Sequence, residues 1–152
     1  MCVMNKKNID IELSGDVLSY RSEENIIPFV EKLKCLLNEL NIYWYLVLIG
    51  NYLIGSNNKT KKIIKTLAKA DKRIKPIIKP KKGMMGWDVR KGLATDGKYI
   101  CVIEGDVQYS IESVIECYKR IKKGNLDLVK TYRIKRYDGI YRHKFKTKNI
   151  NS

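Results

Sequence analysis

Apolar and polar residues alternate with helical spacing in the segment that follows Ser22. Apolar side chains recur there every three or four positions, at Ile26, Phe29, Val30, Leu33, Leu36, Leu37 and Leu40. This spacing predicts an amphipathic helix with one buried face. Pro28 suits the first turn of such a helix, where its missing N–H is not needed.

Two other segments, Tyr43–Ile49 and Tyr99–Ile103, are continuous apolar runs that contain aromatic and β-branched residues. A strand that is buried on both faces of a parallel sheet has this pattern. Both segments are therefore predicted to be central strands.

Shorter segments complete the pattern. Strands are predicted at 74–78, where Pro76 favours a sheet edge, and at 126–131. Helices are predicted from Asn57 or Asn58 to Ala70, from Trp87 to Leu93 and after a capping Ser110, with Gly83 and Gly86 marking a loop. This alternation of strands and helices predicts an α/β layer fold with a mostly parallel sheet.

The chain is strongly basic, and the charge lies in two blocks. Residues 59–82 hold 11 Lys and Arg against 1 acidic residue, and residues 119–148 hold 12 against 2. Such blocks suit an anionic partner, although a lysine-rich composition alone also produces them. A nucleic-acid partner is not expected, because no recognised nucleic-acid motif is present and the aromatic residues do not interleave with the basic blocks.

The 152 residues fit one packed domain, predicted at 1–142 and followed by a basic tail at 143–152. The longest apolar stretch, 42–54, is shorter than the ~20 residues that a membrane-spanning helix needs, and no secretory signal is visible. A cytoplasmic location is expected, with the membrane surface as a second option. The four cysteines form no CxxC pair and are expected to be reduced and packed.

Candidate chemistry follows the second central strand, in the segment Glu104-Gly105-Asp106-Val107-Gln108. Ligands of open α/β sheets bind at the carboxyl ends of the strands, which is where this segment is predicted to lie. Two carboxylates and an amide at alternate positions supply the oxygen ligands that Mg²⁺ or Mn²⁺ prefers. On spacing alone, an ordinary polar loop remains the alternative.

Several motifs in order resemble family 2 glycosyltransferases, especially the dolichyl-phosphate mannosyltransferase-like, polyprenyl-phosphate branch. Glu104-Gly105-Asp106-Val107-Gln108 is similar to the family's D-x-D-x-Q turn. Arg90-Lys91-Gly92-Leu93 is similar to its R-x-G-L helix, and Tyr20 with 23–25 is similar to the end of its P-x-Y-N-E-E-E-N signature. Arg133 matches the family's arginine that follows the next strand after the D-x-D-x-Q turn.

The resemblance implies a GT-A nucleotide-diphospho-sugar transferase fold, a Rossmann-like three-layer sandwich. It implies that Glu104, Asp106 and Gln108 hold Mg²⁺ or Mn²⁺ and that Asp106 is the catalytic residue. It also implies that the donor, a nucleotide-diphospho-sugar, contacts Tyr20, Glu104, Arg90, Arg133 and Arg136. The acceptor would be a polyprenyl phosphate or a glycan, with peripheral membrane or partner-chain association.

Two departures from the family pattern define an alternative function. Leu53 and Ile54 precede Gly55-Ser56 where the family has two aspartates, and the resemblance ends near Arg142. The alternative is a truncated, catalytically inactive relative that acts as a binding or partner module. Relatives have a part beyond this point that positions the acceptor. Without it, the chain is expected to bind the donor but to show little or no sugar transfer.

Overall fold

The computed structural model describes residues 1–4, 10–93, 95–105, 110–137 and 140–148. Its strands form one sheet in the order β4-β3-β2-β5-β1-β6-β7. The strands are β1 (Cys2–Met4), β2 (Leu13–Leu18), β3 (Trp44–Ile49), β4 (Ile74–Ile77), β5 (Tyr99–Glu104), β6 (Leu128–Tyr137) and β7 (Ile140–Lys148). β2 to β5 pair in parallel, whereas β1 pairs antiparallel with β5 and β6, and β6 pairs antiparallel with β7. The described part of the sheet is therefore mixed but mostly parallel.

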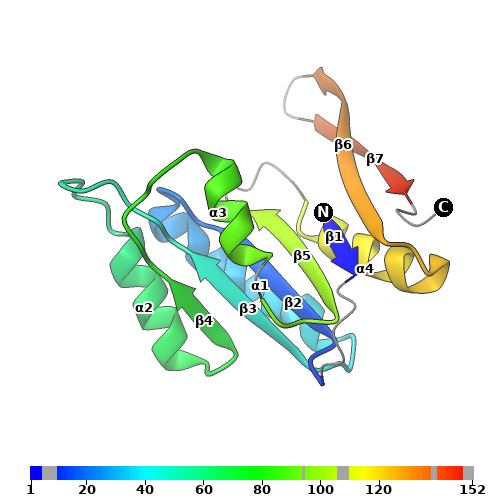
Figure 1. Ribbon diagram of the computed structural model, residues 1–152, viewed down its shortest axis with the longest axis horizontal. Helices are drawn as coiled ribbons and strands as arrows, with labels where there is room; N and C mark the ends of the chain where they lie inside the picture. Colours follow the sequence, from blue (N-terminus) through cyan, green and yellow to red (C-terminus); the bar gives the residue numbers. More distant parts are fainter. Residues whose placement is uncertain (5–9, 94, 106–109, 138–139, 149–152) are drawn as a thin grey trace.

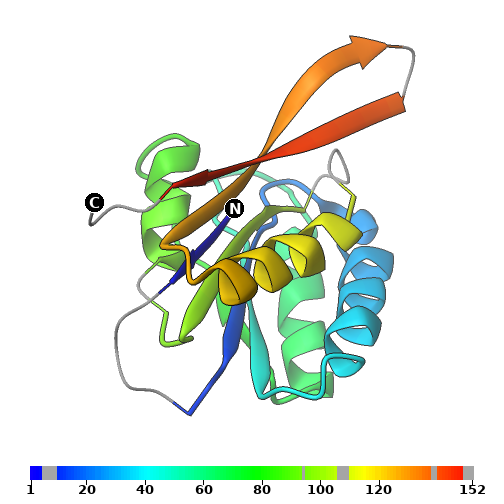
Figure 2. The same ribbon diagram turned by 90° about the vertical axis from the view of Figure 1, so that its right-hand side faces the viewer.

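Helices cover both faces of the sheet (Figure 1). A short 3-10 helix, η1 (Glu23–Asn25), leads into α1 (Ile26–Asn38), and the others are α2 (Thr60–Ala70), α3 (Met85–Gly92) and α4 (Glu112–Gly124). Figure 2 shows α1, α2 and α4 on one side of the sheet and α3 on the other. This is the three-layer α/β architecture predicted from the sequence. None of the described helices combines the length and apolar composition that crossing a bilayer requires.

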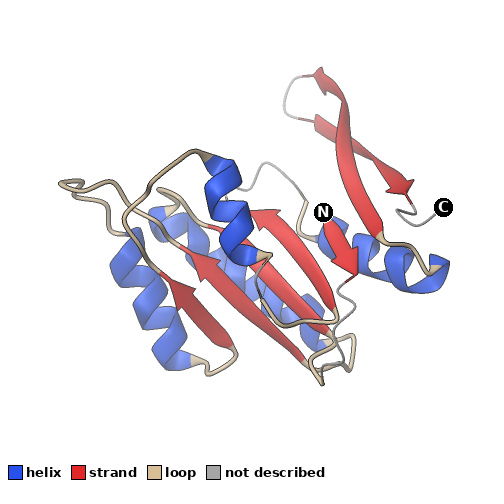
Figure 3. Ribbon diagram, viewed as in Figure 1, coloured by secondary structure: helices blue, strands red, loops and turns tan. Residues whose placement is uncertain are grey.

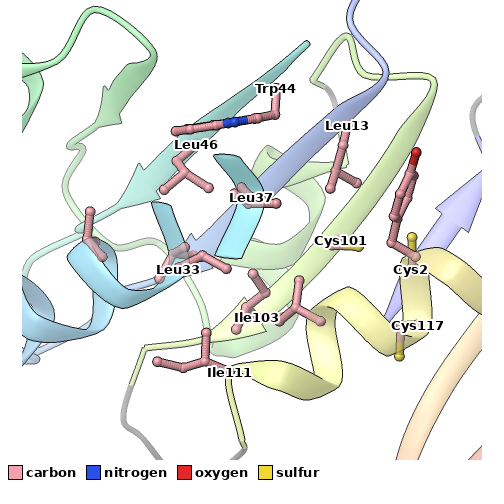
Figure 4. Close-up of a cluster of buried hydrophobic side chains, with 14 of the residues drawn as sticks. Cys2, Leu13, Leu33, Leu37, Trp44, Leu46, Cys101, Ile103, Ile111 and Cys117 are labelled. Carbon is pink, nitrogen blue, oxygen red and sulfur yellow. The ribbon is translucent and has the colours of Figure 1, made fainter. Parts of the chain in front are cut away.

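The main core lies between the sheet and the layer of α1, α2 and α4. Figure 4 shows Leu33 and Leu37 of α1 gathered with Leu46 of β3 and Ile103 of β5 in this core. Each of these side chains is 7% exposed or less. A smaller cluster of Tyr45, Val47 and Ile49 lies on the opposite face of β3. Because both faces of β3 are covered, every residue of this strand is buried, which explains its unbroken apolar run.

Several sequence predictions are confirmed. β3 and β5 each have a strand on both sides, and β4, which contains Pro76, is an edge strand of the described sheet. The side-chain oxygen of Asn58 accepts a hydrogen bond of 2.9 Å from the backbone N–H of Thr60, the first residue of α2, but the N-cap residue of this helix is Lys59 and not Asn57 or Asn58. All four cysteines are free, but Cys35 is exposed rather than packed.

Other predictions of element boundaries are wrong. Gly86 lies inside α3, and not in a loop. Ser110 does not cap α4, because its hydroxyl bonds the carboxylate of Glu112 and the N-cap residue is Ile111. β6 extends from Leu128 to Tyr137, well past the predicted 126–131, because it pairs with β7. β7 in turn crosses the expected start of the basic tail at residue 143.

Candidate functional site

The carboxyl ends of the four parallel strands lie level at one rim of the sheet. Leu18, the last residue of β2, pairs with Ile49 at the end of β3 and with Glu104 at the end of β5. Ile49 in turn pairs with Ile77 at the end of β4. The loops that leave these strands therefore start side by side, as in ligand sites of other open α/β sheets.

Glu104 lies at this rim and is half-buried. The backbone N–H of the next residue, Gly105, donates a 2.9 Å hydrogen bond to the carbonyl of Leu18. A Cβ atom at Gly105 would approach that carbonyl and the side chains of Val17 and Ile26 to 3.1 Å, so a larger residue there would require these neighbours to shift by a few tenths of an ångström. The start of the candidate metal turn is thereby fixed beside the β2–α1 loop. Asp106 and Gln108, the next members of that turn, lie outside the described residues.

Tyr20 lies in the β2–α1 loop, two residues after Leu18, and is 36% exposed. Two cationic groups face its ring. The Lys81 ammonium lies 4.0 Å from the ring centroid, and the Arg21 guanidinium lies 5.2 Å from it. Both distances are within the range of cation–π attraction. The rim thus presents an aromatic ring flanked by positive charge.

A buried polar network joins the loops after β3 and β4 to α3. The Asn51 side-chain amide donates to one carboxylate oxygen of Asp88 at 2.5 Å, and the Lys81 ammonium donates to the other oxygen at 2.8 Å. The backbone N–H of Lys79 donates to the Asn51 side-chain oxygen at 3.1 Å. The side chains of Lys81 and Asp88 are only 12% and 6% exposed. Because Lys81 also faces Tyr20, this network links α3 to the rim.

Sequence reasoning missed Asn51, Lys81 and Asp88. Leu53 and Ile54 precede Gly55-Ser56 where the family has two aspartates, but β3 ends at Ile49, as predicted, and Gly50 and Asn51 are the residues that follow it directly. Leu53 and Ile54 lie further along the loop and are exposed. The position of Asn51, a polar residue almost directly after a buried strand, is a signal that could have identified it. Lys81 gives no such signal, because it lies in a block where lysines are frequent.

α3 is packed closely against β2. A Cβ atom at Gly92 would come within 2.8 Å of a carboxylate oxygen of Asp16, so glycine permits this close approach. Burial raises the pKa of Asp16 to about 8, and the hydrogen bonds from Thr95 offset part of that rise. Arg90, the predicted diphosphate ligand of this helix, is exposed.

Arg133 and Arg136 lie on β6. Cys2 of β1 pairs with Cys101 of β5 on one side and with Val129 of β6 on the other. Cys101 and Val129 therefore lie at the same level of the sheet. Arg133 follows Val129 by four residues, and the β6–β7 hairpin extends past the carboxyl ends of the central strands (Figures 1 and 2). The backbone of β6 therefore brings Arg133 to the same end of the sheet as Glu104.

A cavity of about 210 Å³ opens beside Glu104. β1 pairs with β5 only from Tyr99 to Cys101, and the cavity lies next to the part of β5 that follows. Its walls are mainly apolar and come from β2, β5, α3, α4 and β6, with Leu18, Glu104, Val89, Val114 and Thr131 among them. The rim therefore has a concave space in contact with the first residue of the candidate metal turn.

The donor set of this turn suits a hard divalent cation, because Glu104, Asp106 and Gln108 offer only oxygen ligands. Glu104 is at the rim, which meets the positional requirement. Within the described ranges no three His, Cys, Asp or Glu side chains form a cluster that could hold a metal ion. Two of the three expected ligands fall outside those ranges.

Comparisons with known proteins add one result. The family model of glycosyl transferase family 2 matches residues 53–151, which is about two thirds of the chain. The match includes α3, β5, the candidate metal turn and β6, whereas Tyr20 and Asn51 precede it. A search of curated proteins finds no match to this chain.

Proposed function

The chain belongs to glycosyl transferase family 2, and we propose that it binds a nucleotide-diphospho-sugar with a divalent metal and transfers the sugar to a polyprenyl phosphate or a glycan. The observation that supports this most directly is the register of the strand ends. It brings Glu104, Asn51 and the loop with Tyr20 to one rim, beside a cavity. Fold and rim together suit a donor that has both an aromatic base and a charged diphosphate.

In this proposal Glu104, Asp106 and Gln108 hold Mg²⁺ or Mn²⁺, and Asp106 is the catalytic ligand. The cation, when bound, neutralises charge that develops on the departing nucleoside diphosphate. Arg90, Arg133 and Arg136 face the diphosphate, since a guanidinium can donate paired hydrogen bonds to phosphate oxygens. Tyr20 offers a ring face to the nucleotide.

The acceptor class determines whether a general base is needed. A polyprenyl phosphate presents an oxygen that is already ionised at neutral pH, so no side chain must remove a proton from it. The only histidine of the chain, His143, is then not required for catalysis. A glycan hydroxyl would instead need a proton acceptor, and a carboxylate of the rim is the candidate for that role.

Donor binding is expected to depend on the metal. Calorimetric titration of the full chain with a panel of nucleotide-sugars should show binding with Mn²⁺ and much weaker binding with a chelator. Asp106→Ala should weaken the binding by at least about tenfold, because it removes a direct metal ligand. Asp96→Ala, which removes an exposed carboxylate before β5, is the matched control and should leave the affinity unchanged. Metal-independent binding that survives Asp106→Ala would contradict the proposed site.

Arg133 is expected to act on the diphosphate rather than on the base. Arg133→Ala should therefore weaken binding of a nucleoside diphosphate by about tenfold and leave the weak binding of the nucleoside alone unchanged. Arg120→Ala, on the exposed side of α4, is the control. Equal losses for both ligands would show that Arg133 does not contact the diphosphate.

A further inference from the structure

Two loops, the β3–α2 loop and the loop that leads into α3, expose aliphatic side chains that are not packed in the hydrophobic core. Ile54 is 85% exposed and Leu53 is 43% exposed in the β3–α2 loop. Met84 is 84% exposed and Met85 is 53% exposed at the start of α3. Figure 3 shows the β3–α2 loop as a tan segment that projects from one side of the molecule. Leu53, Ile54 and Met84 are absent from the packed core, whereas Met85 also lines the cavity beside Glu104.

Hydrogen bonds join the two loops. The backbone N–H of Lys81 donates to the carbonyl of Tyr52 at 2.8 Å, and the backbone N–H of Tyr52 donates to the carbonyl of Lys79 at 3.1 Å. Leu53 and Ile54 directly follow Tyr52, and Met84 and Met85 come three and four residues after Lys81. Both loops also leave the carboxyl ends of their strands, so they lie on the same rim as Tyr20. The exposed apolar tips therefore belong to one edge of the molecule.

Lysines surround this edge. Five exposed lysines lie on the two loops and the first turn of α2, namely Lys59, Lys61, Lys62, Lys79 and Lys82. The acidic groups nearby are Glu24, which pairs with Lys59 at 3.5 Å, and Glu23, which accepts a hydrogen bond from Asn58. The single acidic residue of the block 59–82, Asp71, follows the far end of α2 and pairs with Arg73. The edge thus combines apolar tips with a net positive charge.

We propose that this edge, formed by Leu53, Ile54 and Met84 with the five lysines, docks on the surface of an anionic lipid bilayer. Exposed aliphatic tips can enter the boundary between headgroups and acyl chains, and lysines beside them are attracted to anionic headgroups. A nucleic acid would complement the lysines but not the aliphatic tips. The resemblance implies a peripheral membrane association without naming a surface, and the inference assigns that association to one edge and to anionic lipids, without depending on the proposed sugar transfer. Docking in this way would bring the rim close to the phosphates of lipids.

The direct test is sedimentation of the full chain with vesicles. One set contains phosphatidylcholine alone, and the other contains phosphatidylcholine mixed with phosphatidylserine. Binding is expected only to the anionic vesicles and should weaken as salt screens the lysines. Equal binding to both vesicle types, or binding to duplex DNA without binding to the anionic vesicles, would overturn the proposal.

Matched variants locate the contact. Ile54→Ser/Met84→Ser should lower partitioning by at least about tenfold, because each apolar side chain is lost from the lipid. Tyr43→Ser removes an 80% exposed side chain at the opposite end of β3 and should have no effect. Lys79→Glu/Lys82→Glu should lower binding far more than Lys69→Glu/Lys72→Glu, which makes the same charge change around the other end of α2. The proposal fails if each pair of variants behaves alike. Circular dichroism of every variant confirms that the chain is folded.

Discussion

Asp16→Asn is expected to remove most of the dependence of the unfolding free energy on pH between about pH 4 and about pH 8. Asp16 is fully buried in β2, and burial raises the pKa of its carboxyl from 3.8 to about 8. In the unfolded chain the group ionises near its ordinary pKa, whereas in the folded chain it stays protonated up to the higher value. Asparagine has the same shape and no charge, so it should fold without this penalty.

The sign of the effect follows from proton binding. Between the two pKa values the folded state holds one more proton than the unfolded state, so stability falls as pH rises and levels off above the folded pKa. A shift of this size corresponds to a loss on the order of 5 kcal/mol across that interval. That is comparable to the whole stability of many domains. Asp16→Asn should therefore be clearly more stable than the wild type at pH 8.

Urea unfolding followed by circular dichroism at a series of pH values measures this difference. Asp96→Asn changes an exposed carboxylate before β5 and should retain the slope of the wild type. If Asp16→Asn also retained that slope, Asp16 would have to be ionised in the folded chain. The packing of Gly92 against it would then need another explanation.

The same residue shows why β2 could not be predicted from sequence. Its residues Ser14, Gly15 and Asp16 interrupt the apolar pattern, yet the strand is central and pairs with β3 and β5. The polar groups are accommodated by tertiary contacts, because Thr95 bonds both Ser14 and Asp16. Nothing local indicates that a threonine 79 residues away will fill this role. By contrast, β3 and β5 were predictable because burial on both faces requires apolar residues at every position.

Some residues of the candidate site could likewise be predicted from the sequence, and others could not. Glu104 and Tyr20 were predictable, because each follows or ends a strand and motif order placed both at the rim. Asn51, Lys81 and Asp88 were not, since their pairing depends on how two loops and α3 meet. β3 ends at Ile49, as predicted, so Leu53 and Ile54 lie in an exposed loop and not at the strand end.

Breaking the Lys81–Asp88 pair is expected to produce the second large effect. Asp88→Ala leaves the Lys81 ammonium and the Asn51 amide largely buried without their shared acceptor. Loss of one partner from a buried ion pair costs about 3–5 kcal/mol, because the remaining charge is uncompensated. Glu24→Ala is the comparison, because it breaks an ion pair at the surface. The side chains of Lys59 and Glu24 are 71% and 62% exposed, so the loss of their pair should cost at most ~1 kcal/mol.

A double-mutant cycle separates the pair from the packing around it. Lys81→Met removes the charge and keeps the length of the side chain, and Asp88→Leu replaces the carboxylate with an apolar group of similar size. If the two groups stabilise each other, the double variant should lose clearly less stability than the sum of the single variants. Additive losses would mean that water already compensates both charges. In that case Lys81 would not be held under the Tyr20 ring by Asp88, and the rigidity of the rim would have to come from the backbone bonds between Tyr52 and Lys81 alone.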